Sequence, residues 1–220
     1  MKINKLIDHT LLKAFATSED IKELCLEAIK YDFASVCVNP CYVSLASELL
    51  RDSDVKVCTV IGFPLGANTP TVKAMETKDA VRNGANEIDM VINIGKAREH
   101  DYNYIIDEIR EVVDSADGNL VKVIIETCYL TKEEIVEVCR CACIAGSQFV
   151  KTSTGFGTGG AKAEDVALMR KSILDTMSVK ASGGIKTLDD LELMVKNGAS
   201  RIGASSGKLI MEQYQERNKK

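Results

Sequence analysis

The chain has 220 residues, of which 45% are hydrophobic and 27% are charged, and its formal net charge is −4. This length and apolar content suit one globular domain with a substantial core, so we expect residues 1–220 to form a single domain. The small negative charge excludes a general basic field and argues against a nucleic-acid partner. A local phosphate site needs no net charge, because backbone N–H groups can bind an anion.

Short apolar runs, several of them rich in Val and Ile, alternate with amphipathic stretches along the whole chain. The runs that predict strands are 5–12, 33–39, 55–63, 87–94, 120–127, 149–154, 179–185 and 201–207. Helical patterns are clearest at 18–31, 71–85, 131–146 and 187–199. We expect Ser18 to cap the first helix and a Thr131–Glu134 capping box to begin the third. Gly84 and Gly146 are the expected C-caps of the second and third helices.

Eight strand and helix units in a chain of this length predict an α/β fold, the (β/α)₈ or TIM barrel. A doubly wound open sheet is the alternative, but such sheets more often contain roughly five to seven strands. The first residues, MKINKLIDHTLLKAF, contain no long apolar run. We therefore expect no signal peptide, no contact with a membrane and a cytoplasmic location.

The eight cysteines include no C-x-x-C pair, and most of them lie in apolar runs. We expect them to behave as small buried hydrophobic residues in a reducing compartment. The CRCAC stretch (139–143) could bind a metal ion, but it lies on a helical pattern with no second ligand pair nearby. The chain has only two histidines, His9 and His100, so histidine-rich metal motifs are absent and we predict no metal.

Polar residues fall at the ends of several predicted strands, where the site of a barrel is built. They are Asp8, His9, Asn39, Gly62, Asp89, Glu126, Lys151 and Lys180. Charges in several buried strands must pair or cost several kcal/mol, as an order of magnitude. Their convergence at one end of one barrel indicates a site. His9 is interpreted as a structural hydrogen-bonding residue rather than a base.

Lys122, Lys151 and Lys180 lie within runs that should be buried on both faces. A free lysine has a pKa of about 10.4, so few of its molecules carry the neutral amine that attacks a carbonyl. Burial and a nearby cation both favour the neutral form, and Lys151 and Lys180 on adjacent strands could supply that arrangement. The alternative is that the two lysines form separate structural ion pairs with Asp89 and Glu126.

Two glycine-rich segments, SGGI (182–185) and IGASSG (202–207), end the seventh and eighth runs, where barrels often bind phosphate. Tight turns that need glycine are the alternative explanation. Gly155, Gly157 and Gly160 also spell the G-x-G-x-x-G dinucleotide pattern. The strand before them carries KTST rather than an apolar run, and the next strand ends without an acid for a ribose, which argues against nucleotide binding.

The chain resembles the deoxyribose-phosphate aldolases, a family of class I (Schiff-base) aldolases on a (β/α)₈ barrel. The resemblance covers nearly the whole chain. The matching segments, in the family's order, are LIDHTLL (6–12), SVCVNP (35–40), VIGFPLG (60–66), EIDMVINIG (87–95), KVIIET (122–127), FVKTSTGF (149–156), KASGGIKT (180–187) and RIGASSG (201–207). It implies the reversible cleavage of 2-deoxy-D-ribose 5-phosphate into D-glyceraldehyde 3-phosphate and acetaldehyde, a step of deoxyribose catabolism.

The resemblance also implies roles for individual residues. The catalytic residues would be Lys151 as nucleophile, Lys180 as the cation that activates it, and Asp89 as a proton carrier through water. Asp8 would lie near the substrate hydroxyl and Cys37 near the reacting lysine. The phosphate would contact Gly155, Gly183, Gly184, Gly203, Ser205 and Ser206. No metal or cofactor is implied, the ligand is a small phosphorylated sugar, and the family implies a homodimer or homotetramer.

The sequence departs from the family pattern in the segment after the second lysine. Ala181 stands where proline is common, followed by Ser182, and no tail tyrosine is recognised, so Tyr214 receives no role. Three other functions stay open: a different Schiff-base barrel of the transaldolase kind, a phosphosugar-binding barrel without chemistry, and an isomerase with Asp89 as base.

Overall fold

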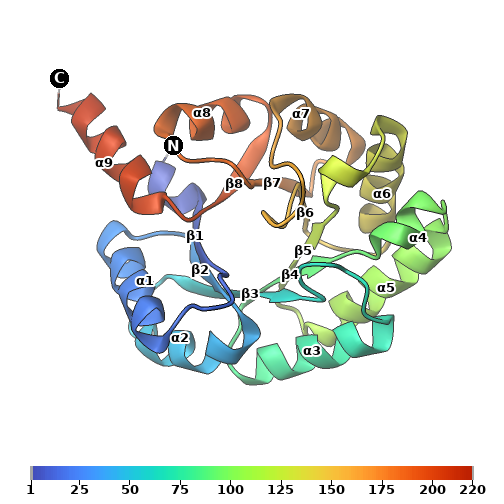
Figure 1. The fold of residues 1–220 in the computed structure, drawn as a ribbon, viewed down its shortest axis with the longest axis horizontal. Coiled ribbons are helices and arrows are strands. Elements are labelled where there is room, and N and C mark those ends of the chain that lie inside the picture. Colours follow the sequence, from blue (N-terminus) through green and yellow to red (C-terminus); the bar gives the residue numbers. More distant parts are fainter. Residues whose placement is uncertain (1, 220) are drawn as a thin grey trace.

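The computed structural model describes residues 2–219 and shows eight parallel strands closed into a barrel (Figure 1). The strands are β1 (Ile7–Leu11), β2 (Ser35–Val38), β3 (Lys56–Ile61), β4 (Glu87–Val91), β5 (Leu120–Ile124), β6 (Phe149–Lys151), β7 (Ser178–Ser182) and β8 (Ala199–Ala204). Each strand pairs with the next one in the chain, and β8 pairs with β1. The predicted (β/α)₈ barrel is confirmed, and the open sheet is excluded.

Helices surround the barrel and follow its strands in chain order (Figure 1). They are α1 (Ser18–Tyr31), α2 (Val43–Leu49), α3 (Pro70–Arg82), α4 (Ile94–Arg98), α5 (Tyr102–Ser115), α6 (Lys132–Ile144), α7 (Ala163–Ser172), α8 (Leu188–Lys196) and α9 (Gly207–Asn218). Short 3₁₀ turns occur at Ile3–Leu6, Pro40–Tyr42 and Thr127–Tyr129. Within residues 2–219, no helix combines the length and the apolar content that crossing a membrane requires.

The helix ends follow the capping chemistry of the sequence, with small shifts. The Thr131–Glu134 capping box is present at the start of α6. The prediction for α1 was wrong by one residue: Thr17 caps it in a box with Asp20, and Ser18 is the first helical residue. Gly84 and Gly146 lie one residue beyond the caps of α3 and α6, with φ of +104° and +82°. A left-handed residue after the cap suits glycine, which has no side chain to strain.

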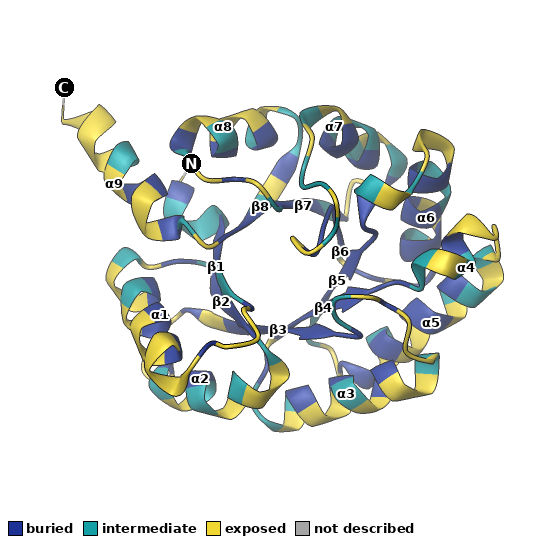
Figure 2. Cartoon of the chain, viewed as in Figure 1, coloured by how far each residue is buried: buried dark blue, intermediate teal, exposed yellow. Residues whose placement is uncertain are grey.

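The apolar residues form two separate cores. The main core fills the space between the outside of the barrel and the helices, so most strand residues are buried, whereas the helices are buried mainly on one side (Figure 2). A small second core consists of Leu12, Cys37, Cys58 and Val60, with Phe63 packed against it. Because side chains alternate along a strand, Ile88 and Met90 join the main core, whereas Glu87 and Asp89 take part in the barrel's ionic contacts. The interior therefore has room for charged groups.

A buried ion pair joins α3 to α5 and fixes the loop after β3. Lys73 Nζ lies 2.5 Å from Glu108 Oε1 and donates to the carbonyl oxygens of Gly66 at 2.8 Å and Val91 at 2.7 Å. Glu108 also accepts from the backbone N–H of Asn93 at 2.8 Å. Burial lowers the pKa of Lys73 and raises that of Glu108, because the charged forms lose water, although each partner opposes the shift of the other. The pair ties this loop to the end of β4.

Glu108→Ala is expected to lower the free energy of unfolding by about 3–5 kcal/mol, because it leaves the Lys73 ammonium buried without its partner. Urea unfolding at pH 7 measures this loss. Glu111→Ala on the same helix is the matched control, because Glu111 is exposed. Equal stabilities of the two variants would contradict a structural role for the pair.

Candidate active site

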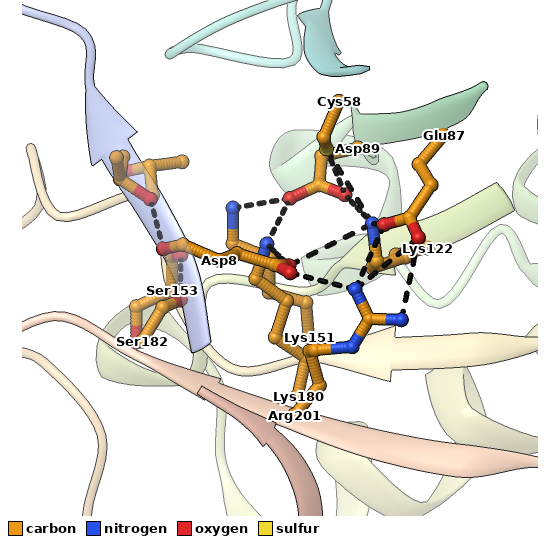
Figure 3. A network of polar contacts seen from close by, with 12 residues as sticks. Asp8, Cys58, Glu87, Asp89, Lys122, Lys151, Ser153, Lys180, Ser182 and Arg201 are labelled. Carbon is orange, nitrogen blue, oxygen red and sulfur yellow. Dashed lines mark hydrogen bonds and ion pairs between the residues drawn. The ribbon is translucent and has the colours of Figure 1, made fainter. Parts of the chain in front are cut away.

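The three predicted catalytic residues meet inside the barrel (Figure 3). Asp89 lies on β4, Lys151 at the end of β6 and Lys180 on β7, and all three are buried. Lys151 and Lys180 are register partners on neighbouring strands. Their side chains converge on one oxygen: Asp89 Oδ2 accepts from Nζ of Lys151 at 2.8 Å and from Nζ of Lys180 at 2.7 Å. The two ammonium groups therefore share a single counter-ion atom.

Lys122 on β5 binds the other oxygen of the same carboxylate. Its Nζ donates to Asp89 Oδ1 at 2.8 Å and lies 2.5 Å from Glu87 Oε2. Asp89 is thus the common partner of three lysines. The alternative in which Lys151 and Lys180 pair separately with Asp89 and Glu126 is wrong: Glu126 instead accepts hydrogen bonds from Thr154.

A further set of ion pairs lies beside this carboxylate. Asp8 on β1 lies 2.5 Å from Lys180 Nζ and 2.6 Å from Arg201 Nη1, and it accepts from the Ser35 hydroxyl at 2.7 Å. Arg201 on β8 also pairs with Glu87 at 3.0 Å. The interior network therefore joins four cationic side chains, Lys122, Lys151, Lys180 and Arg201, to three carboxylates, Asp8, Glu87 and Asp89. When all are charged, one positive charge is in excess.

Mutual attraction fixes the charge states of this network. Burial alone would raise the pKa of Asp89, but the three ammonium groups around it outweigh that effect and hold the pKa well below its usual range. Asp8 behaves in the same way, with Lys180 as its main partner, and its pKa is also lowered. Burial would lower the pKa of Lys180, but Asp8 and Asp89 hold it above its usual range. Lys180 thus remains a cation and Asp89 an anion at neutral pH.

Lys151 is the member of this network that lines a cavity at one end of the barrel. The cavity has a volume of about 240 Å³ and lies at the carboxyl ends of the strands. Its walls are Thr10, Leu11, Leu12, Lys13, Lys151, Thr154, Gly155, Phe156, Ser182, Gly183, Gly184, Ile185, Lys186, Gly203, Ala204 and Ser205. Lys151 is 3% exposed, whereas Lys180 and Lys122 are 0% exposed. Of these three lysines, Lys151 is therefore the one that is accessible from the cavity.

Most of the predicted phosphate-binding residues line the same cavity. Gly155, Gly183, Gly184, Gly203 and Ser205 are among its walls, and Ser206 follows as the cap of α9. Gly155, Gly183 and Gly184 have φ of +86°, +84° and +80°, a conformation that favours glycine. At Gly203 a Cβ atom would lie 3.0 Å from Lys180 Cε, so this glycine leaves space for the lysine.

The hydroxyl groups after Lys151 satisfy the polar backbone at the ends of β6 and β7. Thr152 Oγ1 donates to the carbonyl of Ser182 at 3.1 Å and accepts from the N–H of Ser182 at 3.1 Å. Ser182 Oγ in turn donates to the carbonyl of Ser153 at 2.6 Å. These bonds extend the pairing of the two strands beyond their regular ends and hold both lysine-bearing strands in place.

Cys37 and Asp8, which the resemblance places beside the substrate, lie behind the cavity rather than in its walls. Cys37 is opposite Cys58 in the register of β2 and β3, and a hydrogen bond from Cys58 lowers its pKa. The ligand atoms of Cys37, Cys58 and Asp89 lie within 4.8 Å of one another, a spacing that suits a metal ion. The three ammonium groups on Asp89 oppose a cation there. The donor set therefore does not fit a metal.

Two other motifs have structural positions. His9 is buried and its Nε2 pairs with Glu27 Oε2 of α1 at 2.8 Å. Gly155, Gly157 and Gly160 lie in the loop between β6 and α7, and α7 begins only at Ala163. A Cβ at Gly160 would lie 2.3 Å from the carbonyl oxygen of Gly183. This glycine is therefore required by the contact between two loops, and the loop does not have the strand–turn–helix form of a dinucleotide site.

Sequence reasoning missed several residues of the site. Glu87 and Arg201 complete the ionic network, and each stands two positions before a predicted residue, Asp89 and Gly203. The strand period of two was the signal that could have found them. Lys13, Phe156 and Lys186 line the cavity from loops, where no period applies.

The chain is similar to known aldolases over most of its length. The sequence model of a family described as DeoC/LacD family aldolase matches residues 2–213. The deoxyribose-phosphate aldolase of Lysinibacillus sphaericus is 61% identical over 94% of this chain and 93% of its own length. The enzyme of that name from Streptococcus suis is 59% identical over 96% of both chains.

Solved structures give the same result. The aldolase QR15 has a TM-score of 0.94 and 41% identity, and the match covers 98% of this chain and 97% of that one. A tetrameric deoxyribose-phosphate aldolase from Aeropyrum pernix has a TM-score of 0.91 and 34% identity, covering 97% of this chain and 91% of that one. With a family match over most of its length and relatives at about 60% identity, this chain belongs to the DeoC/LacD family of aldolases.

Proposed function

We propose that the protein cleaves 2-deoxy-D-ribose 5-phosphate reversibly into D-glyceraldehyde 3-phosphate and acetaldehyde through a Schiff base on Lys151. The observation that carries this proposal is the position of Lys151, which lines the cavity while sharing Asp89 Oδ2 with Lys180. A second cation beside an amine favours the neutral, nucleophilic form. The relatives named as deoxyribose-phosphate aldolases support the choice of substrate.

In the proposed reaction, neutral Lys151 adds to the aldehyde carbon of the open-chain sugar and forms a carbinolamine. Loss of water gives an iminium ion. The C–C bond between C2 and C3 then breaks, its electron pair moves to the iminium, and the C3 hydroxyl loses its proton as glyceraldehyde 3-phosphate leaves. The remaining enamine takes up a proton at carbon, and water releases acetaldehyde. The iminium is the electron sink, so the mechanism predicts that chelators do not inhibit the enzyme.

Asp89 and Lys180 are proposed to assist the proton transfers. Asp89 is within hydrogen-bond distance of Lys151 Nζ, which becomes the carbinolamine nitrogen. A water molecule between that nitrogen and the carboxylate would carry the proton, with Asp89 as acceptor and Lys180 as donor. Lys180 has a further role as a fixed cation, because its pairs with Asp8 and Asp89 keep it charged.

The substrate phosphate is proposed to bind at Gly155, Gly183, Gly184, Gly203, Ser205 and Ser206. Glycine lets backbone N–H groups approach an anion, and serine hydroxyls before a helix add further donors. Lys186, which lines the same cavity, adds positive charge. We further propose that Asp8 and Cys37 support the site without lining the cavity. Asp8 would orient Lys180, and Lys180 would in turn orient the substrate hydroxyl.

The biological setting is proposed from the family. Deoxyribose phosphate arises from deoxynucleosides, so the reaction belongs to their catabolism in the cytoplasm. The protein is proposed to act as a homodimer or homotetramer, as the tetrameric relative from Aeropyrum pernix suggests. Sedimentation of the purified protein measures the oligomeric state.

Borohydride trapping with acetaldehyde tests the proposal. Reduction of the iminium should leave an ethyl group on Lys151, which peptide mass mapping locates. An adduct on Lys180 would keep the aldolase class but exchange the roles of the two lysines. If no lysine is labelled, although a phosphosugar binds, the protein is a binding barrel or an isomerase. Solvent deuterium incorporation without cleavage would identify the isomerase, and profiling of sugar phosphates would identify an aldolase of another substrate.

A further inference from the structure

Glu126, which follows β5, holds the loop that forms one wall of the cavity. Its carboxylate is 1% exposed and accepts hydrogen bonds from the backbone N–H of Thr154, at 3.2 and 3.3 Å, and from the Thr154 hydroxyl. The same hydroxyl accepts from the backbone N–H of Phe156 at 3.0 Å. Glu126 thus fixes two N–H groups of this turn, one directly and one through a single hydroxyl.

The hydrogen-bond partners of this carboxylate are Thr154 of the loop and the Cys128 thiol rather than cations. The ion pairs of the barrel interior, within residues 2–219, connect Lys151, Lys180 and Lys122 to other carboxylates. Burial raises the pKa of Glu126, and the hydrogen bonds from Thr154 and the charge of Lys151 oppose this rise. Burying a carboxylate without an ion pair is unfavourable unless hydrogen bonds compensate. The hydrogen bonds from the loop are therefore what compensates the burial of the Glu126 carboxylate.

The backbone and the packing around Glu126 are both specialised. Glu126 has φ 53° and ψ 67°, a left-handed conformation that is costly for a residue with a side chain. At Gly157 a Cβ atom would lie 3.3 Å from Glu126 Oε2 and 2.8 Å from Cys128 Sγ. The loop lies directly against the carboxylate, and glycine makes this approach possible. The segment after β5 and the loop after β6 therefore pack closely against each other.

We propose that Glu126 is a positioning residue for phosphate recognition, which fixes the turn Thr154–Gly157 so that the Gly155 backbone faces the cavity. The inference rests on the proposed function, because it assigns the phosphate to Gly155. Hydrogen-bond donors that are already held in place need no conformational change when the anion binds, so binding loses less free energy. Without Glu126, the backbone N–H and the hydroxyl of Thr154 lose their acceptor, and the turn is free to move.

The reacting lysine is held independently of Glu126. Lys151 Nζ binds Asp89, and the carbonyl of Lys151 accepts from the N–H of Ile125 at 3.0 Å. Its strand is also paired with β7. Loss of Glu126 should therefore weaken the recognition of the phosphate group while leaving Schiff-base chemistry at Lys151 in place.

The test compares 2-deoxy-D-ribose 5-phosphate with unphosphorylated 2-deoxy-D-ribose as substrates of the full chain. For Glu126→Ala, we expect KM for the phosphorylated sugar to rise about tenfold or more, the effect of one lost charge-assisted hydrogen bond. The kcat/KM for deoxyribose should stay within about twofold of wild type. Glu126→Gln, which can still accept from Thr154 N–H and donate to its hydroxyl, should recover most of the affinity. Glu133→Ala, an exposed acid in α6, is the control.

Thr154 variants provide a second, independent test. Thr154→Val should reproduce the rise in KM and Thr154→Ser should not, because serine keeps the hydroxyl that joins Glu126 to Phe156. The double variant Glu126→Ala/Thr154→Val should be little worse than Glu126→Ala alone, since Glu126→Ala has already removed the contact between the carboxylate and the Thr154 hydroxyl. If Glu126→Ala does not fold, the Gln and Thr154 variants still decide the question.

Equal losses on the two sugars, or a fall in kcat without a change in KM, would overturn the positioning role. The outcome for the proposed function is separate. If wild type neither cleaves deoxyribose 5-phosphate nor is trapped by borohydride with acetaldehyde, the proposed function fails. If wild type is active and the variants do not discriminate between the sugars, the inference on Glu126 fails alone.

Discussion

Replacing Lys151 by leucine is expected to lower kcat/KM for deoxyribose 5-phosphate by at least about 10⁴-fold, because the proposed reaction uses the Lys151 amine as its nucleophile. Leucine fills much of the same space, and the network loses one of four cations while its three carboxylates keep partners. The fold should therefore survive. Steady-state cleavage and borohydride trapping measure the two consequences, and both signals should disappear together.

Lys162→Leu is the control for this variant, because Lys162 is exposed in the loop that follows the same strand. Its activity and its adduct on Lys151 should match wild type. A Lys151→Leu protein that kept full activity would exclude the Schiff-base mechanism. A protein that lost cleavage but still gave an ethyl adduct at Lys180 would show that the second lysine can serve as nucleophile.

Replacing Lys180 by leucine is expected to lower kcat at pH 7 by about 10²–10³-fold, with a loss that shrinks as the pH rises. Lys180 repels positive charge at Lys151, and it also occupies part of the Asp89 oxygen that Lys151 binds. Without it, Asp89 Oδ2 stabilises the ammonium form of Lys151 alone. The kcat that is lost at pH 7 should therefore be partly recovered at higher pH.

The raised pKa of Lys180 determines which part of the pH–rate profile this lysine can affect. Because Asp8 and Asp89 hold the pKa of Lys180 above its usual range, the lysine keeps its proton through neutral and moderately alkaline pH. The wild-type profile between pH 6 and 9 should contain no limb from Lys180. Lys180→Arg retains a cation and should recover much of the activity at pH 7. A loss of the same size at every pH would show that Lys180 acts by something other than its charge.

The sequence allowed the barrel and its charged residues to be predicted because parallel strands buried on both faces leave few places for charge. Lys151, Lys180 and Asp89 stand in apolar runs, so their side chains had to meet inside the barrel. Glycines that line the cavity were also named beforehand, Gly183 from its place after the seventh strand and Gly155 from the family resemblance.

The sequence did not allow the partners within the site to be predicted. Glu126 follows β5, whereas Asp89 lies within β4, and Glu126 has a left-handed backbone and binds Thr154 instead of a lysine. That turn depends on the fit between two loops, which neighbouring residues in the chain do not determine. Asp8 pairs with Lys180 and Arg201, and neither partner could be predicted, because the residues that face one another inside the barrel depend on the stagger of the strands.

The two separate cores have a consequence for how this protein tolerates change. The main core outside the barrel carries most of the apolar burial, whereas the interior holds the charged network and the small group around Cys37 and Val60. Substitutions in the interior can therefore alter which carbonyl compound reacts without removing the apolar contacts that keep the chain folded. In evolutionary terms, the stability of the fold and the choice of substrate are separable traits. Selection for activity on a new aldehyde can change the interior residues while the surrounding helices stay unchanged.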